Sequence, residues 1–321
     1  MGIIARKQEQ KKLLSKYNSG EYEFVAVYGR RRIGKTYLIN HTFENKFTFK
    51  HTALDPFDEK GNEAKTNLED QLSFFCKSLK DYGYPIDHLN NWFEAFDALE
   101  KLIERKNNNQ RILIFIDELP WLDTPKSNFL KAFEGFVNGY ACAHDNIMLI
   151  VCGSAISWIL NNLIKNSCGL YKRVLTKMKI SPYSLKEIEE YLLSRSIHLS
   201  HYEIASAYMV FGGAPEYYRE LEKDTSLARY IDESFFTKDG SLKQEIKLLF
   251  RSTFKNYELV ERVVDVLSTK KIGYSWKELV EKLNISEGDS LLRALEALEN
   301  SDFIIKYIPF GYDKRIPYYK L

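Results

Sequence analysis

The 321-residue sequence has few cysteines, almost no net charge and no long apolar run. Its four cysteines, Cys76, Cys142, Cys152 and Cys168, form no C-x-x-C pair, so we expect free thiols in a reducing compartment rather than a disulfide framework. The 46 basic residues nearly balance the 44 acidic ones, which argues against a protein whose whole surface attracts nucleic acid. No window approaches the ~20 apolar residues of a membrane span, and no signal peptide opens the chain. We therefore expect a cytoplasmic protein without a membrane partner.

Three short apolar runs predict strands of a parallel sheet. Phe24–Tyr28, Ile112–Ile116 and Ile147–Val151 lack the alternation of a half-exposed strand, which is typical of strands covered on both faces. Phe47–Leu54 is a further strand candidate, and a helical region extends from about residue 62 to residue 105. Strands that alternate with helical segments predict an α/β fold.

After Ser181 the pattern changes, and no further buried strand is expected before the C-terminus. Residues 183 to about 255 suit a series of amphipathic helices. Three more helices, around 259–267, 276–283 and 291–298, precede two short strands at 303–308 and 316–321 that are joined by a turn. Three helices followed by a β-hairpin predict a C-terminal winged-helix domain.

A glycine-rich motif follows the first predicted strand. The sequence G-R-R-R-I-G-K-T fits the P-loop pattern G-x-x-x-x-G-K-[ST], and it stands between a strand and a helix, as the chemistry requires. Backbone N–H groups would face the phosphates, and the lysine would bridge the β- and γ-phosphates. The alternative is a glycine-rich turn with a surface lysine. The predicted nucleotide-binding residues are Gly29, Arg30, Arg31, Arg32, Ile33, Gly34, Lys35, Thr36 and Tyr37.

An acidic pair follows the strand Ile112–Ile116. Its position places Asp117 beside the P-loop, where Asp117 and the Thr36 hydroxyl would hold Mg²⁺. Glu118 is the expected general base, which aligns a water molecule on the γ-phosphate. A GTPase is disfavoured, because no N-K-x-D element occurs and Asp117 does not begin a D-x-x-G motif. The two motifs together predict hydrolysis of a nucleoside triphosphate.

The strand Ile147–Val151 leads into Cys152-Gly153-Ser154. Ser154 would project into the same crevice, close to the γ-phosphate. The alternative is that Ser154 caps the helical stretch that begins with Ala155-Ile156. Both interpretations remain open from the sequence.

The ordered motifs resemble those of the AAA+/STAND-like P-loop ATPases, in particular the prokaryotic "archaeal ATPase" family. The resemblance rests on Tyr28–Thr36, Ile112–Leu122, Cys152–Ser154, Leu170–Arg173 and Gly212–Tyr217. It implies a P-loop NTPase fold, with a parallel-sheet core at 1–181, a helical lid at 182–255 and a winged helix at 256–321. ATP or ADP with Mg²⁺ would lie between the core and the lid.

The resemblance also implies roles for single residues. Ser154 would be the sensor-1 residue, Pro215 would touch the adenine as part of a G-x-P element, and Arg173 would stabilise γ-phosphate charge within the chain or across a subunit interface. Pro215 could instead simply start a helix, and Arg173 could be an ion-paired surface residue. Ala5 replaces the glycine of the related G-R-x-x-E lead-in, so no base contact is assigned to Arg6. Relatives often continue into a nuclease-like domain, but we find no D-(x)n-E-x-K arrangement on paired strands that would supply a nuclease site here.

The predicted winged helix is not basic. Residues 256–321 contain ten basic and eleven acidic residues, and the predicted recognition helix carries mainly carboxylates. Such a helix repels DNA phosphates. We expect this module to pack on the core or to bind a protein partner, with DNA contact as the alternative. Basic residues of the wing that could make that contact are Lys306, Lys314 and Arg315.

The leading hypothesis is an ATP-binding and ATP-hydrolysing switch, in which the nucleotide sets the angle between core and lid. The alternative is a DNA-binding regulator whose P-loop domain responds to nucleotide with little turnover. A small-molecule kinase is disfavoured, because the Asp117-Glu118 pair suits the activation of water.

Overall fold

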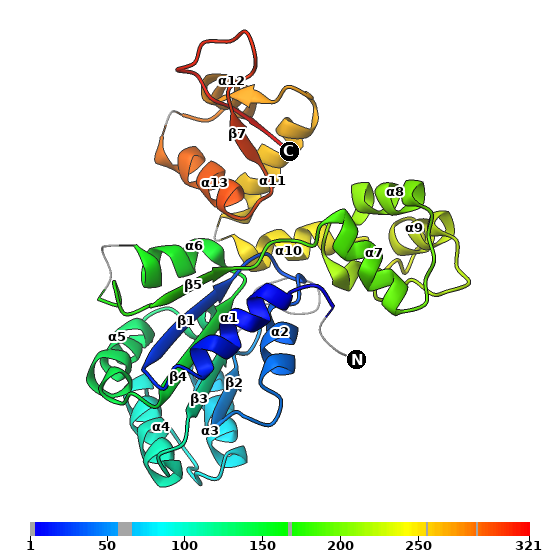
Figure 1. Ribbon diagram of the computed structural model, residues 1–321. Coiled ribbons are helices and arrows are strands. Elements are labelled where there is room, and N and C mark those ends of the chain that lie inside the picture. The colour runs from blue at the N-terminus through cyan, green and yellow to red at the C-terminus, as the bar shows by residue number, and fades with distance from the viewer. Residues whose placement is uncertain (1–3, 57–65, 166–168, 255, 287) are drawn as a thin grey trace.

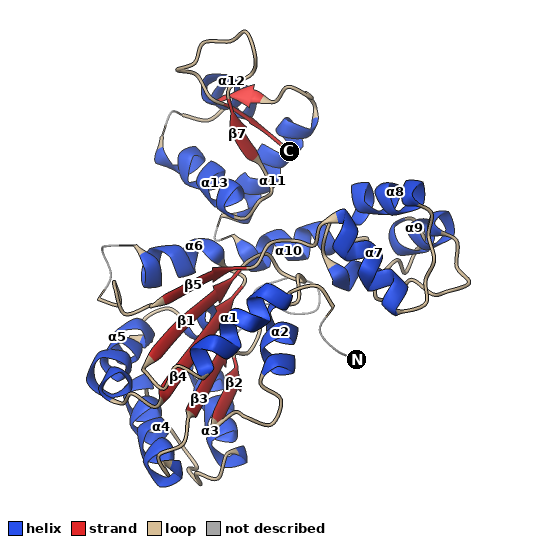
Figure 2. Ribbon diagram, in the orientation of Figure 1, coloured by secondary structure: helices blue, strands red, loops and turns tan. Residues whose placement is uncertain are grey.

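A parallel five-stranded sheet forms the centre of the protein. The computed structural model describes residues 4–56, 66–165, 169–254, 256–286 and 288–321 (Figure 1). Within these residues the sheet has the order β2-β3-β4-β1-β5, and every paired neighbour is parallel (Figure 2). The predicted α/β fold is confirmed. The strands are β1 (Glu23–Tyr28), β2 (Phe49–Thr52), β3 (Ile112–Asp117), β4 (Ile147–Gly153) and β5 (Thr176–Lys179).

Strand β5 and one helix boundary differ from the prediction. The sequence Thr176-Lys177-Met178-Lys179 alternates buried and exposed side chains at the sheet edge, and it lacks the continuous apolar run that identified the other strands. The predicted helical region from about 62 to 105 is two helices, α3 (Leu68–Asp81) and α4 (Trp92–Lys106), and its first four residues lie outside the described residues. An asparagine side chain caps the start of each helix.

Successive side chains of each strand point to opposite faces of the sheet, and helices cover both faces. Phe24 and Ala26 of β1 belong to a buried cluster with α3, α4, α5 (Phe129–Gly135) and α6 (Ile156–Ile159). Val25 and Val27 point to the opposite face, where α1 (Lys7–Tyr17) and α2 (Lys35–Thr42) pack. These four β1 side chains are fully buried, which fixes the strand whose carboxyl end leads into the P-loop.

Helices α7 (Leu185–Ser194), α8 (His201–Phe211) and α9 (Leu227–Phe235), with the 3-10 turn η5 (Pro215–Tyr218), form a unit beside the sheet that we call the helical lid (Figure 1). Capping boxes start α7 at Ser184 and α8 at Ser200. Phe211, Tyr218 and Tyr230 form the centre of the lid's own buried cluster. The lid thus has a small separate core.

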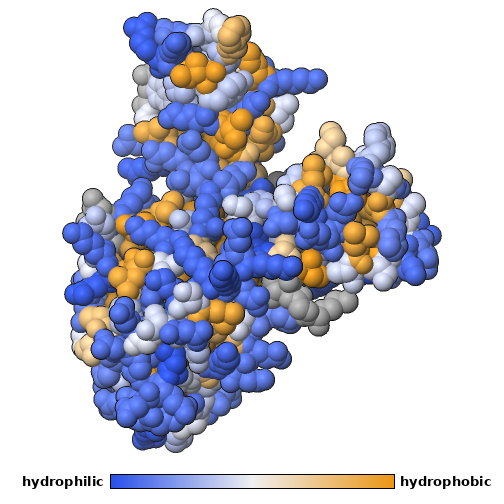
Figure 3. All heavy atoms as spheres, viewed as in Figure 1, coloured by the Kyte–Doolittle hydropathy of each residue, from blue (hydrophilic) through white to orange (hydrophobic). Residues whose placement is uncertain are grey.

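The predicted winged helix is confirmed at the C-terminus. Its helices are α11 (Tyr257–Ser268), α12 (Trp276–Leu283) and α13 (Asp289–Asn300), and its antiparallel strands, in the order β6-β8-β7 within the described chain, are β6 (Tyr274–Ser275), β7 (Ile305–Tyr307) and β8 (Tyr318–Lys320). Strand β6 was not predicted, because two residues carry no detectable pattern. Figure 3 shows apolar atoms on the surface of this unit as well as on the lid.

Helix α10 (Glu245–Thr253) joins the lid to the winged helix. Leu249 and Phe250 of α10 and the following Phe254 belong to the buried cluster of the winged helix. We therefore call residues 245–321 the C-terminal module. The division at residues 181/182 and 255/256 stays a prediction, and packing groups α10 with the units that follow it.

Two further expectations concern cysteines and membranes. Cys76, Cys142 and Cys152 are free thiols, and Cys168 lies outside the described residues. Among the helices of the described chain, we find none with the length and apolar character that a bilayer crossing requires.

Candidate functional site

The P-loop connects β1 to α2 at the carboxyl edge of the sheet. Its backbone needs left-handed conformations at Arg32 (φ 66°) and Gly34 (φ 85°), and glycine adopts such a φ without steric cost. The buried Lys35 ammonium donates hydrogen bonds to the carbonyl oxygens of Gly29 (3.0 Å) and Arg30 (2.8 Å). The lysine is therefore held over the loop by the loop's own backbone, at the place where a phosphate would bind.

Thr36 and Asp117 meet at the base of the loop. The Thr36 hydroxyl donates to Asp117 Oδ2 at 2.8 Å, although 81 residues separate them in the sequence. Burial, and then the neighbouring Glu118 carboxylate, raise the pKa of Asp117. A hydroxyl and a carboxylate side by side are oxygen ligands of the kind that Mg²⁺ prefers.

Glu118 and Ser154 form the second polar pair. Glu118 Oε2 accepts hydrogen bonds from the Ser154 backbone N–H (2.9 Å) and hydroxyl (3.0 Å). The Glu118 backbone is left-handed (φ 49°, ψ 45°), a strained state for a non-glycine residue and one that clusters at functional sites. The cap residue of α6 is Ala155, and the Ser154 hydroxyl binds Glu118 instead of capping that helix.

Gly153 allows this pair to form. A Cβ atom on Gly153 would lie 2.7 Å from Cδ of Pro120, which belongs to the turn after Glu118. Only glycine therefore lets the end of β4 approach the turn that carries the acidic pair.

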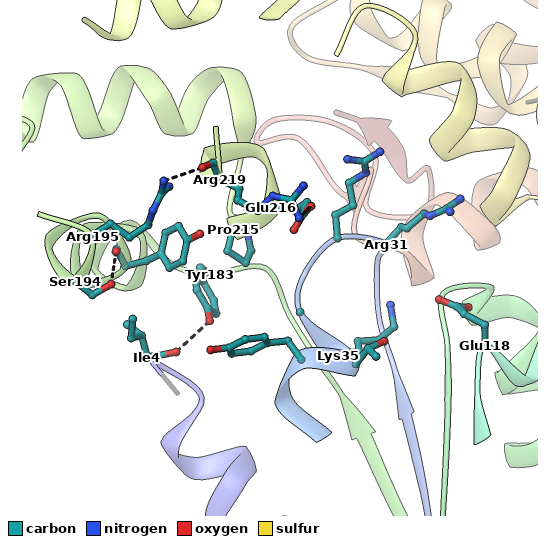
Figure 4. Close-up of a pocket in the computed structure, with 15 residues that line it drawn as sticks. Ile4, Arg31, Lys35, Glu118, Tyr183, Ser194, Arg195, Pro215, Glu216 and Arg219 are labelled. Carbon is teal, nitrogen blue, oxygen red and sulfur yellow. Dashed lines mark hydrogen bonds and ion pairs between the residues drawn. The ribbon is translucent and has the colours of Figure 1, made fainter. Parts of the chain in front are cut away.

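A pocket of about 1050 Å³ opens between the P-loop and the helical lid (Figure 4). Its volume is at the upper end of the range typical of small-molecule sites. Glu118 and Lys35 lie toward one end, and Ile4 and Tyr183 toward the other (Figure 4). The lining residues are Ile4, Arg31, Arg32, Gly34, Lys35, Thr36, Tyr37, Glu118, Tyr183, Tyr191, Ser194, Arg195, Pro215, Glu216 and Arg219.

Most residues predicted from motifs lie in or directly behind this pocket. Pro215 lines it and also begins the turn η5, so both interpretations of this proline describe its position. Tyr37 lines it with an exposed ring stacked on His41. Asp117 and Ser154 lie behind the pocket wall. Asp117 is hydrogen-bonded to Thr36, and Ser154 is hydrogen-bonded to Glu118. Ile33 is buried in the core below the loop.

Arg173 does not join this group. It is exposed, and it lies just before Leu175, whose N–H donates to the Phe24 carbonyl near the start of β1. Burial raises the pKa of Tyr22, the residue just before β1, and the nearby charge of Arg173 opposes this increase. The five steps along β1 span about 16 Å, so Arg173 lies at the opposite end of the sheet from the P-loop of its own chain.

Two arginines of the P-loop contact the C-terminal module. The Arg30 guanidinium lies 3.8 Å from the ring centroid of Phe303, which follows α13. Arg32 Nη2 pairs with Glu245 Oε2 at 2.6 Å, at the first residue of α10. Burial lowers the pKa of Arg30, because the charged guanidinium loses solvation. The loop that would bind phosphate therefore also holds the module.

The lid supplies pocket residues that sequence reasoning missed, namely Tyr183, Tyr191, Ser194, Arg195 and Arg219. Arg195 donates to the carbonyl oxygens of Arg219 (2.7 Å) and Leu221 (3.1 Å), and so fixes the chain that follows η5. These residues have no regular spacing. The Ser181-Pro182 break just before Tyr183 was the one available signal.

The N-terminal segment also reaches the pocket. Ile4 lines it, and the Tyr183 hydroxyl donates to the Ile4 carbonyl at 3.1 Å. Ala5 adopts a left-handed φ of 56°. Arg6 donates to the Ser181 carbonyl and lies over the Tyr183 ring, so its observed contacts hold the segment against the lid.

Sequence comparisons give relatives among archaeal proteins. Residues 4–221 match the family described as an ATPase domain predominantly from Archaea. Uncharacterized protein MJECL04 of Methanocaldococcus jannaschii is 26% identical over 308 residues, which cover 96% of this chain and 63% of that protein, so the chain spans less than two thirds of its length. Uncharacterized ATP-binding protein MJ0423 of the same organism is 44% identical over 44 residues, which cover 14% of this chain and 75% of that protein.

Solved structures share the fold. The Walker-type ATPase paby2304 of Pyrococcus abyssi superposes with a TM-score of 0.67 at 16% identity, covering 98% of this chain and 93% of that one. The ORC2 protein of Aeropyrum pernix, in its ADP form, gives 0.50 at 15% identity, covering 100% and 90%. At such identities the likeness concerns the arrangement of sheet, lid and winged helix alone.

Proposed function

Because the chain belongs to the family of ATPase domains found predominantly in Archaea, we propose that it binds ATP with Mg²⁺ between P-loop and lid and hydrolyses it. The observation that carries the proposal is the Thr36–Asp117 hydrogen bond, which places a hydroxyl and a carboxylate beside Lys35 and on the same side of the pocket as Glu118. This set supplies phosphate binding, metal binding and a base.

Thr36 and Asp117 would hold the magnesium ion, and the ion would neutralise charge that develops on the phosphate oxygens. Among the described residues no group of three or more His, Cys, Asp or Glu side chains could hold a metal. This suits an ion that takes its remaining ligands from phosphate and water. Lys35 would exchange its two backbone carbonyl partners for phosphate oxygens.

Glu118 is the proposed general base. Ser154 holds Glu118 Oε2 with two hydrogen bonds, which fixes the carboxylate on the pocket wall and leaves Oε1 to accept a proton from water. The water oxygen then bonds to the γ-phosphorus, and the bond to the ADP oxygen breaks. Ser154 is thus a positioning residue. Arg173 would act only on the pocket of another copy of the chain.

The other end of the pocket suits a base. Tyr37 comes from α2, Ile4 from the N-terminal segment, and Tyr183 and Pro215 from the lid. An apolar and aromatic wall of this kind fits the flat faces of adenine. A nucleotide bound along the pocket would therefore touch core and lid together.

This double contact supports the proposal of a molecular switch. The moving parts would be the core (1–181), the lid (182–255) and the winged helix (256–321), with α10 as the joint between the last two. ATP, ADP and the empty state would differ in the angle between core and lid, because each fills the pocket to a different extent.

The wing, which comprises β7, β8 and the loop between them, suits a protein partner better than DNA. Both Arg315 Nη2 and Nε donate to the Asp313 carboxylate, at 2.8 and 3.1 Å, which offsets the charge of this arginine. Phe310 at the tip is fully exposed. DNA binding would still be open to Lys306 and Lys314, and gel shifts at several salt concentrations test it. Salt-dependent binding that is lost in a Lys314→Ala/Arg315→Ala variant would favour the DNA-binding regulator.

Two variants test the central proposal. Calorimetry with MgATP should detect no binding to Lys35→Ala, because the variant lacks the cation of the loop. Glu118→Gln should keep the affinity within about threefold and lose at least ~100-fold in phosphate release, because glutamine keeps the shape of the side chain but cannot take a proton. Unchanged turnover in Glu118→Gln would remove the base assignment.

A further inference from the structure

Three arginines on the pocket wall are already paired with carboxylates. The pairs are Arg31 with Asp55 at 2.9 Å, Arg219 with Glu216 at 2.9 Å and Arg32 with Glu245 at 2.6 Å. The side chains of Asp55 and Glu216 are each 36% exposed, whereas that of Glu245 is 8% exposed. Exposed pairs contribute little, but a buried carboxylate depends on its partners.

Glu245 has a second partner in the lid. The Tyr217 hydroxyl donates to Glu245 Oε1 at 2.9 Å, so the carboxylate joins the P-loop, the turn η5 and α10. The carboxylate stands at the first residue of α10 and is 8% exposed, so its contacts fix the start of this helix against the P-loop and the lid. Leu249 and Phe250, one turn further on, lie in the core of the C-terminal module.

A second contact ties the same loop to the module. Phe303 packs edge-on against Phe250, with ring centroids 5.3 Å apart, and carries the Arg30 guanidinium on its face. Lys179 of β5 pairs with Asp302 at 2.8 Å beside it. The module is therefore docked on the core through α10 and Phe303. In the P-loop, Arg32 contacts α10 and Arg30 contacts Phe303.

We propose that Glu245 is an affinity determinant of the pocket, which competes with nucleotide phosphates for Arg32 and thereby couples pocket filling to release of the C-terminal module. The inference rests on the proposed ATP binding. When a phosphate draws Arg32 away, the buried Glu245 carboxylate keeps, among the described residues, only the Tyr217 hydroxyl, and its loss of solvation is no longer offset. Helix α10 then shifts to bring Glu245 to water.

Linkage makes the coupling reciprocal. If nucleotide binding weakens the docking of the module by some factor, then docking weakens nucleotide binding by the same factor, and a variant with weaker docking binds nucleotide more tightly. Removal of the Glu245 charge should therefore tighten the binding of nucleotide, although Glu245 lines no part of the pocket itself.

The first test uses the unaltered protein with magnesium and a non-hydrolysable ATP analogue, the β,γ-imido compound. Calorimetry measures binding, and hydrogen exchange measures the opening of residues 245–254. Saturation with the analogue should raise exchange in this segment at least about threefold. Binding without that rise overturns the inference and leaves the proposed function standing, whereas no binding at millimolar analogue overturns both.

The second test uses Glu245→Gln, which keeps the size of the side chain. Its affinity for the analogue should be about fivefold tighter or more, and residues 245–254 should exchange fast already without nucleotide. The matched control is Glu23→Gln, since Glu23 is 5% exposed and pairs with Lys16 at 3.0 Å at the first residue of β1, at the end of the strand away from the P-loop. Equal affinities in Glu245→Gln and the unaltered protein, or equal tightening in the control, would contradict the inference. Circular dichroism should show the same helix content for both variants as for the unaltered protein.

Discussion

The pocket and the wing both place polar side chains on irregular backbone, but their surroundings differ. In the pocket, Glu118 is bonded to the buried Ser154 at the end of a buried strand. In the wing, Arg315 is bonded to Asp313 at the surface, in a loop beyond the three-residue strand β7. A hydrogen bond to a buried group is costly to lose, whereas water replaces an exposed one. The comparison indicates that precise chemistry belongs to the core, and that the wing can change its contacts at little cost.

The largest expected effect is on the pair of Glu118 and Ser154. Ser154→Ala removes the hydroxyl from Glu118 and leaves only the backbone N–H, so the carboxylate loses its fixed orientation. We expect phosphate release to fall about 100-fold, equivalent to about 2.7 kcal/mol, with ATP affinity nearly unchanged. Steady-state phosphate release and calorimetry measure the two quantities.

The corresponding change in the wing is Arg315→Ala, which should leave turnover within about twofold. If the two substitutions had similar effects on turnover, the distinction between core and wing would be broken.

A smaller effect separates two phenylalanines of the C-terminal module. Phe303 packs against Phe250, Phe254 and Arg30, whereas Phe310 is fully exposed at the tip of the wing. Phe303→Ala should lower the free energy of unfolding by about 2 kcal/mol, because Phe303 is partly buried, and Phe310→Ala by less than about 0.5 kcal/mol. Urea unfolding monitored by fluorescence measures both. Equal losses would mean that the tip of the wing is packed in solution.

The smallest effect concerns acid. Burial lowers the pKa of His51 to about 3, and within the described residues its Nε2 has no hydrogen-bond partner. Below its ordinary pKa of about 6.5 the unfolded chain takes up a proton that the folded chain refuses, so stability falls as the pH drops from about 6.5 toward 3. Between pH 7 and 5.5 the loss should be about 1 kcal/mol.

His51→Asn isolates this contribution, because asparagine can keep a hydrogen bond to Ser78, which His51 Nδ1 makes at 2.8 Å. The variant should lose about 1 kcal/mol less than the unaltered chain over the same interval. Residues 245–321 contain no histidine, so we expect the loss of stability in acid to affect the sheet that carries His51 and not the C-terminal module. Parallel pH profiles for the two proteins would refute the assignment.

The fold could be predicted where burial leaves a regular trace in the sequence. Strands β1, β3 and β4 are covered on both faces, so their apolar runs are continuous. Strand β5 lies at the sheet edge and alternates, and β6 has two residues, so neither carries enough signal. The break between α3 and α4 contains Gly83 and Pro85, which typically end a helix, and the apolar spacing alone does not register such a break.

Only those parts of the site that belong to motifs of fixed spacing could be predicted. The P-loop and the Asp117-Glu118 pair have set positions relative to strands, and they lie together at the carboxyl edge of the sheet. The partners of Arg30 and Arg32 are Phe303 and Glu245, more than 200 residues away. Nothing local marks those two residues, because their contacts depend on how the module docks.

The backbone at Ala5 has a consequence for engineering. A left-handed φ of 56° costs a non-glycine residue on the order of 1 kcal/mol, and the contacts of Arg6 keep the segment in that state. A substitution by glycine usually lowers thermal stability, because it increases the conformational entropy of the unfolded chain. At residue 5 that rule runs in reverse, and Ala5→Gly should raise the melting temperature by a few degrees.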